Sequence, residues 1–220
     1  MQNQRLNVLK ILLKIAEKPI GPKPGFEVTD VIKLFFVLGE GAPKGRKNLS
    51  KELQLGEGSV RTLLNRLQES GLVKMERNGC RLTESGASLY RELAKMITQP
   101  KPVDAGSFSQ GAWNYAILIR GSAMKIKSGL EQRDAAVRAG ANGATTLLYV
   151  AGRFSLPSVD MDVEKTYPSS FWKTLRGLLN PKDGDSIIIV GAGSAKAAER
   201  GALTAALQTL LADIPLTQKT

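Results

Sequence analysis

The stretch LGEGSVRTLLNRLQESGLV, residues 55–73, carries the pattern that most restricts how this chain can fold. Its apolar residues recur at positions i, i+3, i+4 and i+7, the spacing of one buried face of an α-helix. They are Val60, Leu63, Leu64 and Leu67. Gly71 follows as a signal for the end of that helix. The polar residues between the apolar ones should face outward, and the question is what they bind. They are Arg61, Thr62, Asn65 and Arg66.

The segments on either side of this helix complete a familiar order of elements. Asn48 can cap a short helix that ends at Leu53, and Gly56 makes the turn into the next helix. Further on, Asn78-Gly79 is the dipeptide best suited to a two-residue type I′ turn between two strands. A helix from about residue 83 to residue 97 follows. Helix, short helix, turn, helix, hairpin, helix is the order of a winged helix-turn-helix.

Two more helices are predicted ahead of this segment. Thr29 can cap a helix over residues 30–38 that carries a core stripe of apolar side chains. Residues 5–18 form a basic amphipathic helix whose apolar residues need a partner. They are Leu6, Leu9, Leu13 and Ile15. This first helix is therefore a candidate dimer element, with attachment to a membrane surface as the alternative.

In a winged helix-turn-helix the helix after the turn enters the major groove of DNA, and the hairpin tip reaches the neighbouring backbone or minor groove. Arg bonds guanine and Asn bonds adenine in bidentate fashion, and a helix N-terminus offers N–H groups to a phosphate. The residues predicted to contact DNA are Ser59, Arg61, Thr62, Asn65 and Arg66 on the helix, Lys74, Arg77 and Arg81 on the hairpin, and Lys44, Arg46 and Lys47 before the short helix. The alternatives are a solvated face in a helical bundle and a winged helix that contacts protein.

The positive net charge of the chain favours a polyanionic partner. The chain has 31 Lys and Arg against 20 Asp and Glu, a formal net charge of +11. Residues 1–100 hold 17 basic and 10 acidic groups, and residues 101–220 hold 14 and 10, so the excess lies mainly in the first half.

Residue types that are rare or missing exclude several classes of site. The chain contains no His and one cysteine, Cys80, which rules out a zinc finger, a Ser-His-Asp triad, a Cys-His dyad and a disulfide within the chain. We expect no catalytic residues, no cofactor and no metal. Neither a membrane span nor a signal peptide is predicted, and a reducing, cytoplasmic compartment is expected.

A polar, Pro-rich stretch divides the chain. We expect a DNA-binding domain at residues 1–100, a linker at 101–111 and an α/β domain at 112–220 that dimerises, senses a ligand, or does both. The second half alternates strands and helices, which favours a small two-layer α/β domain with a mixed sheet and makes the whole chain α+β. The strands are expected at 112–120 and 186–193, with a hairpin at 145–157 that turns at Ala151-Gly152, and the helices at 129–141, 169–179 and 194–212.

The best candidate ligand site in the second half is the turn in IIIVGAGSAKAAERGA. Glycines allow close approach, and the following helix N-terminus could bind a small anionic ligand such as a phosphate. The residues concerned are Gly191, Gly193, Ser194 and Lys196. The pattern departs from the dinucleotide fingerprint, since Lys196 takes the third Gly position and no acidic residue follows about 20 positions on after another strand. A turn of small residues that lets the helix pack on the sheet is the alternative.

Two weaker candidates remain in this half. Gln132-Arg133-Asp134 precedes GANGATT (140–146), where ion pairs at a subunit contact are set against a ligand role. Asp160, Asp162 and Glu164 would share one face of a strand, either to bind a divalent cation or as a solvated acidic edge.

The segment LSKELQLGEGSVRTLLNRLQESGLVKMERNGCRLTESG resembles the winged-helix domains of MarR- and ArsR-like prokaryotic transcriptional regulators, including the LT-x-x-G that opens the helix after the wing. From about Phe26 onward the chain also resembles an archaeal family of winged-helix regulators whose C-terminal domain has no assigned function. VIKLFFVLGE, EQRDAAVRAGANGATTLLY and GALTAAL carry this second resemblance. The resemblance implies DNA binding by the first domain and says nothing of an effector.

Together these features predict a two-domain, sequence-specific regulator of transcription that binds double-stranded DNA as a homodimer, with or without a ligand signal. A nucleotide- or phosphate-binding enzyme with a winged-helix head and a protein-interaction module are the competing interpretations.

Overall fold

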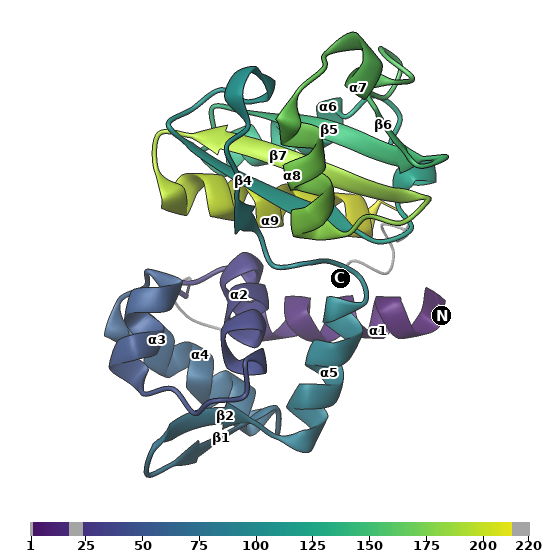
Figure 1. Ribbon diagram of the computed structural model, residues 1–220. Coiled ribbons are helices and arrows are strands. Elements are labelled where there is room, and N and C mark those ends of the chain that lie inside the picture. Colours follow the sequence, from purple (N-terminus) through teal and green to yellow (C-terminus); the bar gives the residue numbers. More distant parts are fainter. Residues whose placement is uncertain (1, 18–23, 213–220) are drawn as a thin grey trace. The chain divides into compact units, whose positions relative to one another are not determined.

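The computed structural model describes residues 2–17 and 24–212, which divide into two compact units (Figure 1). The first unit ends at Ala94 and the second begins at Lys95. Each unit has its own buried apolar side chains, and each is treated by itself below.

The first unit is mainly helical and contains one hairpin. Its elements are α1 (Gln2–Ala16), α2 (Val28–Gly39), α3 (Arg46–Leu53), α4 (Glu57–Glu69), β1 (Val73–Glu76), β2 (Gly79–Leu82) and α5 (Glu84–Ala94).

α1 packs inside this unit, against α2, α5 and α4. Leu9 and Ile15 are buried, and Leu6 and Leu13 are half-buried. The apolar face of α1 therefore has its partner within the unit. This removes the reason for expecting α1 to be a dimer element.

Two predicted helix caps are wrong. α2 begins one residue before Thr29, which is itself buried, and its N-cap is Glu27, whose backbone N–H donates to the Asp30 carboxylate over 2.8 Å. α3 begins at Arg46 after Gly45, so Asn48 lies in its first turn, exposed to solvent. In both places the helix extends further toward the N-terminus than the side-chain signal indicates.

The second unit is a sheet with helices. Its elements are β3 (Lys101–Pro102), the 3₁₀-helix η1 (Gly106–Phe108), β4 (Trp113–Ile119), the 3₁₀-helix η2 (Ala123–Lys125), α6 (Leu130–Arg138), β5 (Gly143–Val150), β6 (Arg153–Ser155), α7 (Val163–Thr166), α8 (Ser170–Leu179), β7 (Asp185–Ala192) and α9 (Ala195–Leu211).

The sheet has the order β3-β4-β7-β5-β6, and every neighbouring pair in it is antiparallel. The expected mixed sheet is therefore wrong. β4 and β5 do run in the same direction, as the helix between them suggests, but β7 lies between them and pairs with both. β4 and β5 would form a parallel pair if they were neighbours in the sheet. Instead β7, which is buried along its whole length, pairs antiparallel with each of them.

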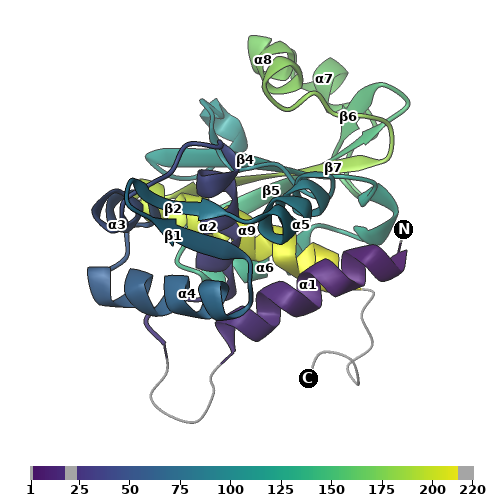
Figure 2. The ribbon, with the colours of Figure 1, turned by 90° about the horizontal axis from the view of Figure 1, so that it is seen from below.

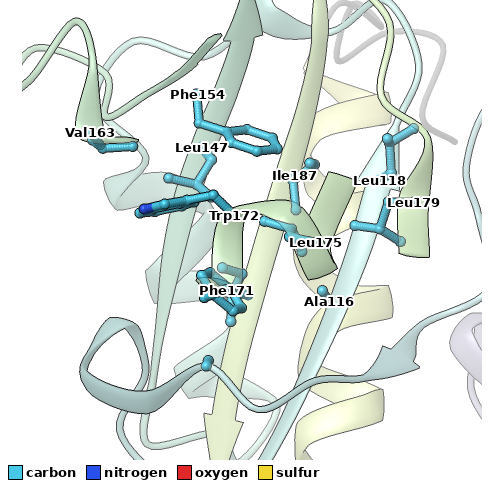
Figure 3. Close-up of a cluster of buried hydrophobic side chains, with 12 residues drawn as sticks. Ala116, Leu118, Leu147, Phe154, Val163, Phe171, Trp172, Leu175, Leu179 and Ile187 are labelled. Atoms are coloured by element: carbon cyan, nitrogen blue, oxygen red, sulfur yellow. The ribbon is translucent and has the colours of Figure 1, made fainter. Parts of the chain in front are cut away.

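Helices cover both faces of this sheet, so the expected two-layer arrangement is also wrong. α9 packs on β4 and β7, and α6 packs on β5 and α9. α8 lies on the opposite face (Figure 1). Phe171, Trp172 and Leu175 of α8 point onto Leu147 and Ile187 of the sheet, which makes the core of that face (Figure 3).

Residues 101–111, expected to be a linker, belong to the second unit. β3 pairs with β4, and the backbone N–H of Val103 donates to the Asn114 carbonyl over 3.0 Å. Ala105 is buried, and the ring of Phe108 lies 4.6 Å from that of Trp172, centroid to centroid. This Pro-containing, polar segment forms an edge strand and a loop of the second unit, and its apolar residues Ala105 and Phe108 reach the core.

Candidate nucleic-acid interface

α4 is held by one apolar side. Val60, Leu63, Leu64 and Leu67 are all buried, as the spacing predicts. The helix ends in a Schellman motif at Gly71, which has a φ of +68°. In this motif the N–H of Leu72 donates to Leu67 and the N–H of Gly71 donates to Gln68, each to the backbone carbonyl. The predicted glycine stop is confirmed.

A tight turn sets α4 against α3. Gln54 ends α3 in the left-handed conformation, with a φ of +56°. The N–H of Leu55 donates to the backbone carbonyl of Ser50, and the Ser50 hydroxyl donates to the Leu55 carbonyl. These reciprocal bonds close the turn between the two helices. The direction in which the outer face of α4 points is thereby fixed.

That outer face holds most of the helix residues predicted from sequence. Arg61, Thr62 and Asn65 are exposed, while Ser59 is half-buried. The Thr62 hydroxyl donates to the Gly58 carbonyl of its own helix over 3.1 Å. The side chains of Arg61 and Asn65 have no hydrogen bond or ion pair within the described part of the chain. They are thus available to a partner.

Gln68 extends the same face and was not among the predicted contacts. It lies three positions after Asn65 and seven after Arg61, and it is exposed. Helical spacing alone puts it in line with them, since residues at i, i+4 and i+7 share a face. Its amide can pair with adenine as that of Asn can. The signal was present in the sequence.

Arg66 faces another way, which corrects its assignment as a DNA contact. Its guanidinium donates to the backbone carbonyls of Ile15, over 2.9 Å, and Glu17, over 2.6 Å. It also lies over the ring of Phe26, 5.2 Å from the centroid. The end of α1 lies beside α4 (Figure 2). Arg66 joins the two through these hydrogen bonds, and its charge is used inside the unit.

The hairpin lies where the sequence predicts it, but its turn differs from the predicted one. Glu76 pairs with Gly79, so the loop is Arg77-Asn78 rather than Asn78-Gly79. Asn78 is not among the residues with positive φ, which excludes a type I′ turn. Gly79 has a φ of +132°, and a Cβ there would lie 2.7 Å from the carbonyl carbon of Lys44. Glycine is required because the segment before α3 passes against β2.

Lys44 is the second predicted DNA contact that has another task. Its backbone exchanges hydrogen bonds with Cys80, which adds a bridge to the hairpin. Its ammonium contacts Glu52 at 2.8 Å and Glu40 at 2.9 Å, and the side chain is 16% exposed. The hydrogen bond to Glu52, aided by Glu40, raises the pKa of Lys44. With two carboxylates bound, Lys44 is not available to a phosphate.

The remaining cations predicted to contact the DNA backbone are exposed. Arg46 and Lys47 lie in the first turn of α3, and Arg77 is at the hairpin tip. On the hairpin, Glu76 contacts both Lys74, at 3.1 Å, and Arg81, at 2.8 Å. The hydrogen bond from Lys74 lowers the pKa of Glu76. Exposed pairs of this kind are weak, so a phosphate can replace Glu76 as the partner of either cation.

The predicted anion site in the second unit has a structural explanation. Gly191 is needed because a Cβ there would lie 2.4 Å from the Ser109 hydroxyl. Ser194 is the N-cap of α9 and accepts from the Ala197 N–H over 3.3 Å. Gly193 and Lys196 are exposed at the same turn. The alternative of a packing turn accounts for Gly191 and Ser194.

The acidic group Asp160, Asp162 and Glu164 does not lie on a strand, which corrects that expectation. Asp162 is the N-cap of α7 and contacts Arg153, while Glu164 contacts Arg176 at 2.5 Å. The Asp160 carboxylate accepts from the backbone N–H of Asp162 over 2.8 Å, so the three carboxylates are used in a local hydrogen bond, a cap and ion pairs. No group of three or more Cys, Asp or Glu able to hold a metal occurs in residues 2–17 and 24–212.

Among the helices that the structure describes, none combines the length and the apolar character that crossing a membrane requires.

Comparisons with known proteins cover both units. Residues 27–88 match the family described as PH0730-like, N-terminal domain, and residues 110–210 match Domain of unknown function (DUF4443). A solved structure, "Hypothetical protein PH0730 from Pyrococcus horikoshii OT3", is similar, with 28% sequence identity and a TM-score of 0.67 over 88% of this chain and 97% of that chain. No curated protein matches. The first match spans the helices and hairpin of the candidate interface, and none of the descriptions states a function.

Proposed function

We propose that the chain is a sequence-specific, double-stranded DNA-binding regulator of transcription in which α4 reads the major groove. The first unit has the element order of a winged helix-turn-helix, and its sequence resembles MarR- and ArsR-like regulators. In this proposal Arg61 and Asn65 contact bases, with Thr62 and Gln68 beside them. Arg46, Lys47 and Arg77 contact phosphates on either side.

One observation carries the proposal. The outward side of α4 presents Arg61 and Asn65, both exposed and without an intramolecular partner in the described residues. Both are side chains that recognise bases, and they stand one helical turn apart on a helix whose other side is locked in the core. The turn closed by the Ser50–Leu55 hydrogen bonds fixes the direction in which this face points.

The second unit completes the proposal as the part that dimerises. Two copies of a modest interface bind two half-sites about 34 Å apart and gain affinity from being joined. A small anionic ligand at the turn before α9 is not part of this proposal, because Gly191 and Ser194 already have structural roles. No catalytic step is proposed.

The test begins with genomic DNA. Fragments that bind the full chain are selected and sequenced, which reports a site and its half-site spacing. The enriched duplex is then titrated against the chain at several salt concentrations. We expect affinity to fall steeply with salt, because bound cations displace counterions from DNA. Arg61→Ala and Asn65→Ala should each weaken binding to the selected site by about 10-fold or more, which corresponds to ~1–3 kcal/mol for a lost base contact.

Lys10→Ala is the matched control for Arg61→Ala. It removes one positive charge from an exposed position on α1, outside the proposed interface. Its binding to the selected duplex should equal that of the parent. Parental binding by both the Arg61 and Asn65 variants would show that α4 is not the reading helix. No binding to duplex DNA at low salt would move the function to protein interaction.

A further inference from the structure

α6 has an outward stripe that the structure leaves without a partner. Leu130, Arg133, Asp134 and Val137 stand at positions i, i+3, i+4 and i+7, and all four are exposed. The two apolar members, Leu130 and Val137, are 52% and 46% exposed. The opposite side of the helix buries Gln132, Ala135 and Ala136. These four exposed residues are called the α6 stripe below.

The two charges in the α6 stripe are paired poorly with each other. The Arg133 guanidinium contacts the Asp134 carboxylate at 3.1 Å. Residues adjacent on a helix point in different directions, so such a pair cannot form the parallel two-bond contact that Arg and a carboxylate prefer. Neither side chain has another partner in the described residues. Each charge is therefore free to take a better placed partner.

Beside the stripe lies a groove of about 460 Å³. Arg133, Asp134 and Val137 form one side of it, and residues 107–110 and 142–145 form the rest. Within the described chain no strand covers residues 143–145 on the outer side of β5, because β6 pairs only with residues 148–150. The stripe and groove are thus one continuous open surface.

The α6 stripe is complementary to a second copy of itself when the two helices run antiparallel. If two α6 helices pack antiparallel about a two-fold axis between Arg133 and Asp134, each Arg133 meets the other copy's Asp134. The same axis sets each Leu130 against the other copy's Val137. Isologous interfaces require this self-complementarity, in which i contacts j and j contacts i. Both the apolar and the charged members of the stripe satisfy it in a single register.

We propose that the α6 stripe is the interface through which a second copy of this chain binds. Two Arg133–Asp134 pairs between the copies stand at its centre, with Leu130 and Val137 at each end. The proposal locates the dimer contained in the proposed function, but it requires no DNA. Molecular mass measured without DNA therefore separates its failure from a failure of DNA binding.

The experiment uses two single variants and their mixture. In Arg133→Asp both stripe charges become negative, and in Asp134→Arg both become positive. Each variant places like charges across the two-fold axis, and we expect sedimentation to show a dimer dissociation constant raised on the order of 100-fold. The two variants mixed one to one should form a dimer with each other, because every cross-axis pair is again opposite in sign. The double variant Arg133→Asp/Asp134→Arg should dimerise like the parent.

Lys173→Asp is the control for a change of charge. It alters an exposed residue on α8, across the sheet from α6, and should leave the dimer intact. The recovery of a mixed dimer excludes unfolding as the reason why the single variants separate. The inference is overturned if the parent chain is a monomer at concentrations of about 100 μM, a level well above that of a working dimer, or if either single variant dimerises as the parent does.

Discussion

At the scale of single residues, Arg61 and Arg66 provide a matched pair on one helix. Arg66 donates two hydrogen bonds to carbonyls and lies over Phe26, whereas Arg61 has no partner in the described chain. We expect Arg66→Ala to lower the free energy of unfolding of the first unit by about 1–3 kcal/mol, since bonds from a charged donor and a cation–π contact are lost at a half-exposed site. Urea denaturation measures this.

Arg61→Ala is the control for that measurement, because it should change the free energy of unfolding by less than about 0.5 kcal/mol. The pair then separates the structural role of Arg66 from the DNA contact that we propose for Arg61. Equal stability of both variants would contradict the structural role given to Arg66.

The difference between these two arginines could not be read from the sequence. Helical spacing separates buried from exposed positions, and it placed Val60 and Asn65 correctly. Arg66 stands at the border of the buried stripe, where its long side chain can turn to either side. The direction of the Arg66 side chain is decided by the two backbone carbonyls to which it donates, those of Ile15 and Glu17, about 50 positions earlier in the chain. Carbonyls carry no residue-type signal, so such partners stay hidden until the fold is known.

At the scale of elements, the connection between the β1–β2 hairpin and α5 depends on Gly86. Thr83 caps α5, since its hydroxyl accepts from the Gly86 N–H and donates to the Gly71 carbonyl. A Cβ on Gly86 would lie 1.9 Å from the carbonyl oxygen of Leu72. The LT-x-x-G pattern therefore has a structural reason: a cap and a close approach between backbones.

We expect Gly86→Ala to destabilise the first unit by about 2 kcal/mol or more, because backbone atoms must move to admit the methyl group. Gly58→Ala is the control within the same unit. Gly58 is exposed in α4, and a Cβ there meets nothing within 4 Å. It should raise the free energy of unfolding by ~0.5–1 kcal/mol through helix propensity. Thermal unfolding followed by circular dichroism compares the two, and a stabilising Gly86→Ala would refute the close approach.

Local sequence signals predicted the positions of the helices, strands and turns better than the order of the strands in the sheet. The turn Ala151-Gly152, the Ser194 region and the buried run of β7 were each found where the sequence indicates them. The antiparallel order was missed because it depends on β7, which enters the sheet between strands that precede it in the chain. Pairing over such separations is set by the packing of whole faces rather than by residues at the turn.

At the scale of the whole chain, each unit carries its own spectroscopic probe. The only cysteine, Cys80, is buried in the first unit, and burial raises its pKa to about 11. A thiol reacts as the thiolate, so Cys80 should resist alkylation at pH 8 until the first unit unfolds. Both tryptophans, Trp113 and Trp172, belong to the second unit, and Trp172 lies on the buried face of α8, in the core between that helix and the sheet.

Separate cores predict separate unfolding. In urea, alkylation of Cys80 should follow the first unit and tryptophan fluorescence the second. Gly86→Ala should then move the alkylation midpoint to lower urea and leave the fluorescence midpoint where it is in the parent. Cooperative unfolding requires shared contacts, and each unit buries an apolar core formed by its own side chains. If Gly86→Ala shifts both midpoints by the same amount, the two units unfold as one cooperative system, and the expectation is contradicted.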